Sequence, residues 1–145
     1  MNKAHFEKLE RMYLSANINT QIFDSTTCRI SEGQSEISLQ VVPKYFHALN
    51  AMHGSVYFKL LDDAAFFATN SVVQDAFVLT KSFEIHFKRP VIEGKILAKG
   101  ELLSAEGEVF IAKSELLNEA GKVVGYGQGE FVKSMAKLTP DIGYV

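Results

Sequence analysis

Two neighbouring carboxylates, Asp62 and Asp63, lie in the most apolar stretch of the chain, residues 56–70. The apolar residues of this stretch fall on every side of a 3.6-residue period, which predicts a helix enclosed by protein. An unpaired ionised carboxylate inside protein costs several kcal/mol or acquires a shifted pKa. The two carboxylates therefore need either a partner or a chemical task.

The two carboxylates differ in their neighbours. Asp63 follows Lys59 by four residues, which is the helical spacing of an ion pair, so we interpret Asp63 as the acid of a half-exposed pair. Asp62 has no partner on its own helix and shares a face with Phe58 and Phe66. A carboxylate in apolar surroundings is either capped by a distant donor or held for acid/base or nucleophilic chemistry. For Asp62 we favour the chemical task.

A small-residue turn, His53-Gly54-Ser55, stands where this helix is expected to begin. Unpaired N–H groups and the positive end of the helix dipole at such a point can stabilise a developing oxyanion, and glycine lets a carbonyl approach the backbone closely. Ser55 is equally suited to be the N-cap. Gly54 and Asp62 are about 12 Å apart along one helix, too far for one carbonyl to reach both. Antiparallel helices across a two-fold axis would bring Gly54 of one subunit to Asp62 of the other.

The segments around this helix predict a single α+β domain over residues 1–145. Helical spacing predicts an N-terminal helix over residues 1–17, and the central helix is expected over residues 53–73. Alternating apolar and polar residues predict an antiparallel, meandering sheet. Its strands are expected within residues 21–42, with a turn near Gly33, and over residues 79–88, 95–104, 108–117 and 123–133.

Three glycines, Gly125, Gly127 and Gly129, fall on one face of the last strand. Glycine at every second position weakens a strand unless a neighbour must come very close, so we expect the bulky central helix against this face. One helix cannot cover such a sheet completely. Its free edges predict that two subunits pair edge to edge, with a higher oligomer built on the dimer.

Composition argues against several classes of protein and site. The net charge of -2 gives no general attraction to nucleic acid, and no run reaches the roughly 18–20 apolar residues of a membrane span. Cys28 is the only cysteine and cannot form an intrachain disulfide, so we expect a reducing compartment and a cytoplasmic protein. The four histidines lack the spacing of a zinc site, so we expect no metal. Two of them, His5 and His86, are expected at the surface.

The order of these residues resembles a known family. Asn50-x-x-His53-Gly54-Ser55, then Asp62, then Phe87-Lys88-Arg89-Pro90-x-x-x-Gly94 is similar to the hotdog-fold acyl-CoA thioesterases of the PaaI type, in the 4-hydroxybenzoyl-CoA thioesterase superfamily. The resemblance spans residues from about 40 to 133. It implies a long antiparallel sheet wrapped around the central helix, and hydrolysis of an acyl-CoA thioester without a further cofactor. It also implies a homodimer with sites at the interface, assembled into a homotetramer as a dimer of dimers.

The resemblance implies roles for individual residues. The Gly54 amide would polarise the thioester carbonyl, and Asp62 of the other subunit would activate water or attack directly. His53 would support the turn or contact the thioester. Thr80 matches a hydroxyl that relatives often supply as serine, although an ordinary strand residue is an equal interpretation.

Two positions depart from the family pattern. Family members often carry asparagine six residues before the histidine, where this chain has His47, and Ser55 replaces the second glycine of the usual His-Gly-Gly. His47 could bond to water or substrate as the asparagine would, or its titration near neutral pH could alter the chemistry. Asn50, Ser55, Lys88 and Arg89 are expected to contact the substrate, the two basic residues at the CoA phosphates.

Two other functions remain open at this point. A hotdog hydratase or dehydratase would use a histidine and an acid for proton transfer at the β-carbon of an acyl-CoA. A non-catalytic protein that binds acyl-CoA or an aromatic ligand is the other alternative, and it would follow if His47 and Ser55 have disabled the site. The identity of the acyl group and the tetramer arrangement do not follow from these residues.

Overall fold

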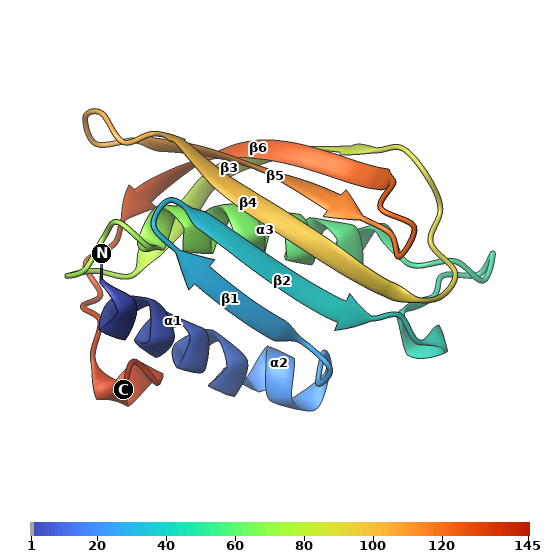
Figure 1. Cartoon of the computed structure of the whole chain (residues 1–145), viewed down its shortest axis with the longest axis horizontal. Coiled ribbons are helices and arrows are strands. Elements are labelled where there is room, and N and C mark those ends of the chain that lie inside the picture. Colours follow the sequence, from blue (N-terminus) through green and yellow to red (C-terminus); the bar gives the residue numbers. More distant parts are fainter. Residues whose placement is uncertain (1) are drawn as a thin grey trace.

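A computed structural model describes residues 2–145 and shows an antiparallel sheet wrapped around one long helix (Figure 1). The helices are α1 (Lys3–Ser15), α2 (Asn17–Gln21) and α3 (Gly54–Asn70), with short 3-10 helices at Pro43–Tyr45 and Pro140–Ile142. The strands are β1 (Thr27–Ser31), β2 (Gln34–Gln40), β3 (Val78–Phe87), β4 (Lys95–Ser104), β5 (Phe110–Leu117) and β6 (Val123–Lys133). They form one sheet in the order β1-β2-β4-β5-β6-β3. The expected α+β class is confirmed.

The observed elements depart from the expected ranges mainly at helix ends. The N-terminal range 1–17, whose residue 1 lies outside the described residues, contains α1 and the start of α2, because Ala16 has extended backbone with ψ 142°. The central helix begins at Gly54 and ends at Asn70 rather than at residue 73. None of the helices in residues 2–145 is long and apolar enough to cross a membrane.

A row of small residues lets α3 lie directly on the sheet. Ser35, Gly100 and Ser114 are neighbours across β2, β4 and β5. The Ser35 hydroxyl donates to the Ala64 carbonyl at 2.5 Å, and the Ser114 hydroxyl donates to the Leu61 carbonyl at 2.7 Å. Between the two serines, a Cβ atom on Gly100 would overlap the Ala64 carbonyl. The backbone of the helix therefore touches the sheet with no side chain between them.

The expectation that the central helix packs against the three glycines of β6 is only partly met. A Cβ atom on Gly125 would lie 3.3 Å from the Tyr57 ring of α3, so the helix is its close neighbour as expected. For Gly127 and Gly129 the expectation is wrong, because β3 pairs with β6 in a register that lays the Phe83 ring over both glycines.

One side of α3 is left open by the chain itself. Leu60, Leu61 and Ala64 are fully buried, yet Phe58 is 40% exposed. The expectation of a helix enclosed on every side is therefore wrong for a single chain, because the sheet covers one side and α1 and α2 cover only part of the other.

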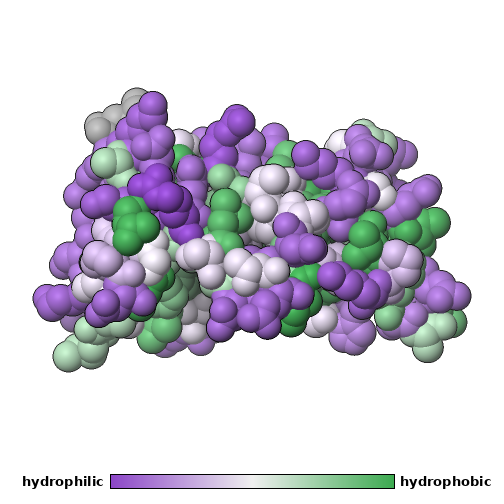
Figure 2. All heavy atoms as spheres, turned by 90° about the horizontal axis from the view of Figure 1, so that it is seen from below, coloured by the Kyte–Doolittle hydropathy of each residue, from purple (hydrophilic) through white to green (hydrophobic). Residues whose placement is uncertain are grey.

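The two ends of the chain form a layer outside the sheet. Figure 1 shows the C-terminal segment beside α1, and Figure 2, which views this side, shows mostly hydrophilic atoms with apolar atoms in separate patches. His5 is only 3% exposed, with Nδ1 2.7 Å from the Tyr144 hydroxyl and Nε2 2.9 Å from the Asn70 carbonyl. The expected surface position of His5 is wrong, because the C-terminal segment crosses α1 and covers the ring. His86 does lie at the surface, stacked on Tyr126.

The contact between Gly100 and α3 predicts a large effect of a single methyl group. Gly100→Ala should lower the free energy of unfolding by about 1–3 kcal/mol, because the new Cβ has no room against the helix backbone. Urea unfolding followed by circular dichroism measures this change. Lys99→Ala, at the neighbouring exposed position of β4, is the control and should unfold within about 0.5 kcal/mol of the wild type. Equal unfolding midpoints for the two variants would contradict the close seating of the helix.

Candidate active site

Asp62 finds its partner on a strand rather than on its own helix. The Thr80 hydroxyl of β3 donates a hydrogen bond to Asp62 Oδ1 at 2.8 Å. Burial raises the pKa of the Asp62 carboxyl from 3.8 to about 6, the Thr80 hydrogen bond opposes that rise, and the charge of Asp63 adds to it. Near neutral pH the carboxylate is thus largely ionised but weakly solvated, a state suited to accepting a proton.

Asp63 belongs to a separate polar cluster. Lys59 Nζ lies 2.9 Å from Asp63 Oδ2, and the Tyr13 hydroxyl donates to the same oxygen at 2.7 Å. The ammonium group also donates to the Tyr13 hydroxyl and to Asn19 Oδ1. The Lys59–Asp63 pair is confirmed, but its side chains are only 11% and 22% exposed because α1 and α2 cover them. This cluster ties the two N-terminal helices to α3.

The turn before α3 is capped by His53 and not by Ser55. His53 Nδ1 accepts a hydrogen bond from the Ser55 N–H at 3.0 Å and lies 2.8 Å from Ser55 Oγ. Because Nδ1 accepts a hydrogen bond here, a neutral ring carries its own proton on Nε2. The Gly54 N–H precedes the first intrahelical bond, and within residues 2–145 it has no hydrogen-bond acceptor. It remains free to bind a substrate oxygen.

The Gly54 turn opens into a hollow of about 340 Å³ that carries basic side chains, which we call the basic hollow. His47, Gly54, Lys88 and Arg89 all line it, so the structure brings four of the predicted site residues together. The Tyr57 hydroxyl donates to the Arg89 carbonyl at 2.7 Å. This bond holds the segment that follows β3 against α3. The lining also includes Ala51, Met52, Tyr57, Phe87 and Pro90.

Asn50 has a local role in the loop that precedes the turn. Its φ of 62° is in the left-handed region, which asparagine tolerates better than most residues. The Asn50 N–H donates to the His47 carbonyl at 2.9 Å, and the Leu49 N–H donates to His47 Nδ1 at 3.1 Å. Asn50 therefore shapes the loop that carries His47. The Asn50 side chain is exposed and is not part of the lining of the basic hollow.

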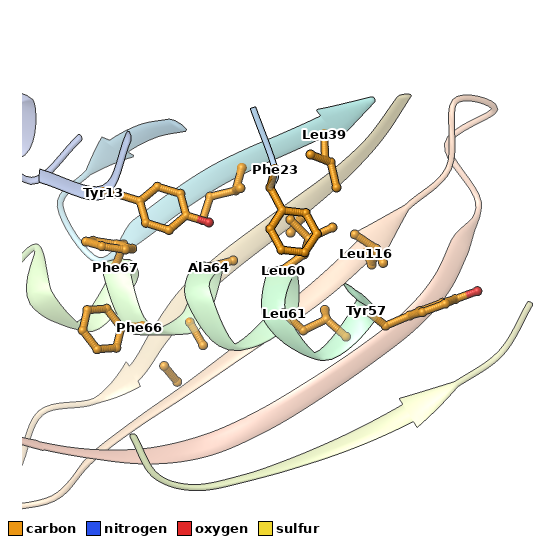
Figure 3. Close-up of a cluster of buried hydrophobic side chains, with 14 of the residues drawn as sticks. Tyr13, Phe23, Leu39, Tyr57, Leu60, Leu61, Ala64, Phe66, Phe67 and Leu116 are labelled. Carbon is orange, nitrogen blue, oxygen red and sulfur yellow. The ribbon is translucent and has the colours of Figure 1, made fainter. Parts of the chain in front are cut away.

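Asp62 and Thr80 line a second, mainly apolar hollow of about 380 Å³. Aromatic rings form part of its wall, and Figure 3 shows Tyr13, Phe66 and Phe67 gathered at one end of α3, with Tyr57 toward the other end. Its complete lining is Met12, Tyr13, Ala16, Ile18, Asn19, Lys59, Asp62, Asp63, Phe66, Phe67, Phe77, Leu79, Thr80 and Ile142. We call this space the acid hollow. It shares no residue with the basic hollow, so Gly54 and Asp62 face different spaces in one chain.

Comparison with known proteins identifies the family. The family model of the Thioesterase superfamily matches residues 49–124, just over half of the chain, including Gly54, Asp62 and Thr80. The chain belongs to the Thioesterase superfamily. The superfamily membership and the hotdog fold inferred from the resemblance are confirmed.

Solved members of the superfamily share this fold at low sequence identity. The Escherichia coli PaaI protein superposes with a TM-score of 0.83 at 20% identity, covering 94% of this chain and 97% of PaaI. Zebrafish Thioesterase Superfamily Member 2 gives a TM-score of 0.77 at 16% identity, covering 89% of this chain and 98% of the zebrafish protein. A protein of Archaeoglobus fulgidus named "Putative esterase" is 24% identical over 110 residues, which are 75% of this chain and 70% of that protein.

Several residues of the acid hollow were not predicted from the sequence. Met12, Ile18 and Ile142 lie outside residues 49–124 that match the Thioesterase superfamily, and they come from opposite ends of the chain. The helical spacing within residues 1–17 was a signal for Met12 alone, and no pattern in the sequence indicated Ile18 or Ile142. Among residues 2–145, no group of three or more histidine, cysteine or acidic side chains could hold a metal ion.

The raised pKa of Asp62 predicts a pH-dependent stability penalty. Between its unfolded value of 3.8 and its folded value of about 6, the native state holds the proton more tightly, so this group's contribution to stability falls as the pH rises. Asp62→Asn removes the penalty and should be more stable than wild type at pH 8 by about 1–3 kcal/mol, allowing for partial exposure. This gain should shrink toward zero by pH 4. Urea unfolding at both pH values measures it.

A surface variant provides the control for the loss of a charge. Glu106→Gln, in the exposed loop between β4 and β5, removes one negative charge away from the site. If Asp62→Asn were no more stable than Glu106→Gln at pH 8, burial would not be the cause of the raised pKa of the Asp62 carboxyl.

Proposed function

We propose that the protein hydrolyses acyl-CoA thioesters. Each active site would combine residues from two subunits. The observation that supports this most strongly is the division of the required groups between two hollows. Asp62, oriented by Thr80, supplies a poorly solvated base, and Gly54 supplies a free N–H at the start of a helix. Membership of the Thioesterase superfamily supports the same reaction class.

Exposed apolar residues support a dimer that joins the two hollows. Phe58 and Leu79, on either side of Asp62 in the chain, are 40% and 49% exposed in the single chain. Within the described part of the chain, the edge strand β3 pairs with β6 alone, so its other edge is available to a second copy. A two-fold axis perpendicular to this edge would pair the two β3 strands antiparallel, set the two α3 helices antiparallel and bring Gly54 of one subunit near Asp62 of the other.

The proposed chemistry uses each group once. The Gly54 N–H and the positive end of the α3 dipole stabilise the thioester oxygen as it becomes an oxyanion. The Asp62 carboxylate takes a proton from a water molecule while the water oxygen bonds to the carbonyl carbon. The carbon–sulfur bond then breaks, the acid is released, and the proton returns to the CoA sulfur. Direct attack by Asp62, followed by hydrolysis of the anhydride, is the other route to the same products.

Neighbouring groups orient the two reacting groups. Thr80 donates to one oxygen of Asp62 and so directs the other toward the water. His53 uses Nδ1 to cap the helix, which leaves its Nε2–H to donate to the substrate. No cofactor is needed for this reaction, since the base, the oxyanion donor and the water are sufficient.

The charges of the two hollows suggest how the substrate lies. CoA carries anionic phosphates, and the exposed Lys88 and Arg89 line the basic hollow. The acid hollow is walled largely by apolar and aromatic side chains and suits the acyl group. The thioester would then lie between them, at the junction of Gly54 and Asp62.

Removal of a single N–H tests the oxyanion role. Gly54→Pro deletes the amide hydrogen at the first helical position, where proline is well tolerated. We expect kcat to fall by about 10²–10³-fold with a folded protein. Gly54→Ala adds a similar Cβ beside Phe87 but keeps the N–H, so it should lose far less activity. Thiol release measured over short, medium, long and aromatic acyl-CoA substrates gives kcat, and equal losses in both variants would argue against the oxyanion role.

Mixing two inactive variants tests the two-subunit site. Asp62→Ala and Gly54→Pro homodimers should each lose most turnover. After subunit exchange, a mixed dimer has one intact site, formed by Gly54 of the first variant and Asp62 of the second. Random pairing should restore about a quarter of wild-type activity. If native mass spectrometry shows mixed dimers and the mixture stays inactive, the site does not join two subunits. Tight acyl-CoA binding by the wild type without thiol release would favour a binding protein instead.

A further inference from the structure

The acid hollow has a wall built from both ends of the chain. Met12 comes from α1, Ile18 from α2 and Ile142 from the C-terminal 3-10 helix, and all three line the same space as Asp62. Met12 is almost fully buried, whereas Ile18 and Ile142 are 46% and 41% exposed. We call these three residues the terminal wall.

Polar bonds hold the C-terminal part of this wall against α1. His5 bonds to the Tyr144 hydroxyl on one side of its ring and to the Asn70 carbonyl at the end of α3 on the other. Arg11 Nε donates to the Val145 carbonyl at 2.8 Å. Gly143 has a φ of 92°, and a Cβ atom there would lie 2.8 Å from Ser15 Oγ. The segment that carries Ile142 therefore fits closely on α1.

A second set of bonds holds α1 and α2 against α3. Tyr13 donates to Asp63, and Lys59 donates to Asn19, both in largely buried surroundings. Breaking one partner of a buried charged pair is strongly unfavourable, because it leaves the other charge unpaired. A ligand in the acid hollow would thus meet a wall that resists displacement.

We propose that the terminal wall sets the longest acyl group that the protein accepts, and that its substrates carry compact acyl groups that end against Met12, Ile18 and Ile142. This proposal rests on the proposed function, since it assigns the acyl group to the acid hollow. A volume of about 380 Å³ is near the lower end of ligand pockets, which run from roughly 300 to 1,000 Å³. A long chain would have to separate α1 and the C-terminal segment from α3.

Two exposed isoleucines of the terminal wall can be shortened with little effect on the stability of the fold. The double variant Ile18→Ala/Ile142→Ala removes side chains that are already partly exposed, so a folded protein is expected. Ile22→Ala is the matched control, because Ile22 ends the same short helix as Ile18 and is 48% exposed, yet it is not part of the hollow's lining. Circular dichroism and thermal unfolding verify that both variants are folded.

The first measurement is kcat/KM along a series of saturated acyl-CoA substrates of increasing length. For the first chain length that wild type rejects, the double variant should raise kcat/KM by about tenfold or more, the usual size of methylene discrimination. Ile22→Ala should leave the length profile unchanged. If the double variant keeps the wild-type profile, the terminal wall does not limit the acyl group.

The second measurement separates this inference from the proposed reaction. S-alkyl-CoA thioethers of graded alkyl length cannot be hydrolysed, and isothermal titration calorimetry gives their Kd. If wild type cleaves no thioester but the double variant extends the range of alkyl lengths that bind, the proposed reaction is wrong and the wall assignment stands. If no thioether binds, or if the double variant and Ile22→Ala show the same length limit as wild type, the wall assignment is overturned.

Discussion

The direct contact between the α3 backbone and the sheet is the constraint on which the rest of this molecule depends. Two serine hydroxyls, from Ser35 and Ser114, donate to carbonyls of the helix, and Gly100 between them leaves no space. These contacts fall at the Leu61 and Ala64 carbonyls, on either side of Asp62 in the chain. A helix held by its backbone can neither rotate nor slide without breaking buried hydrogen bonds. Asp62 is thereby directed toward Thr80 of the edge strand β3 and toward the acid hollow.

The same helix turn places two adjacent carboxylates in different surroundings. Asp63 has an ammonium and a phenol hydroxyl within hydrogen-bond distance, so its charge is neutralised locally. Among the described residues Asp62 accepts one side-chain hydrogen bond, from Thr80, and burial of the carboxyl raises its pKa. Neighbouring acids whose environments differ in this way can take different tasks: Asp63 holds α1 and α2 against α3, and the chemical task is the one we propose for Asp62. The polar cluster around Asp63 also anchors the helices that carry Met12 and Ile18, so it supports the wall of the same hollow.

Local patterns in the sequence predicted the helices, the strands and several candidate site residues that the structure brings together. The apolar helix with its His53-Gly54 start, the alternating strands and the spacing of Lys59 and Asp63 all depend on neighbours within a few residues, and such signals can be read along a chain. The motif order also sufficed to assign the superfamily. Those features follow from helix and strand geometry, in which a given separation along the sequence corresponds to a defined distance in space.

Contacts between residues far apart in the chain could be seen only in the folded protein. Thr80 meets Asp62 across 18 residues, Tyr13 meets Asp63 across 50, and His5 meets Tyr144 across 139. The capping by His53 and the composition of the acid hollow were likewise hidden, because they depend on rotamers and on how separate segments pack. Local patterns indicate which residues form the central helix, the strands and the Gly54 turn. Packing decided which side chain each of them faces, since no local period encodes the distance between segments that meet only after folding.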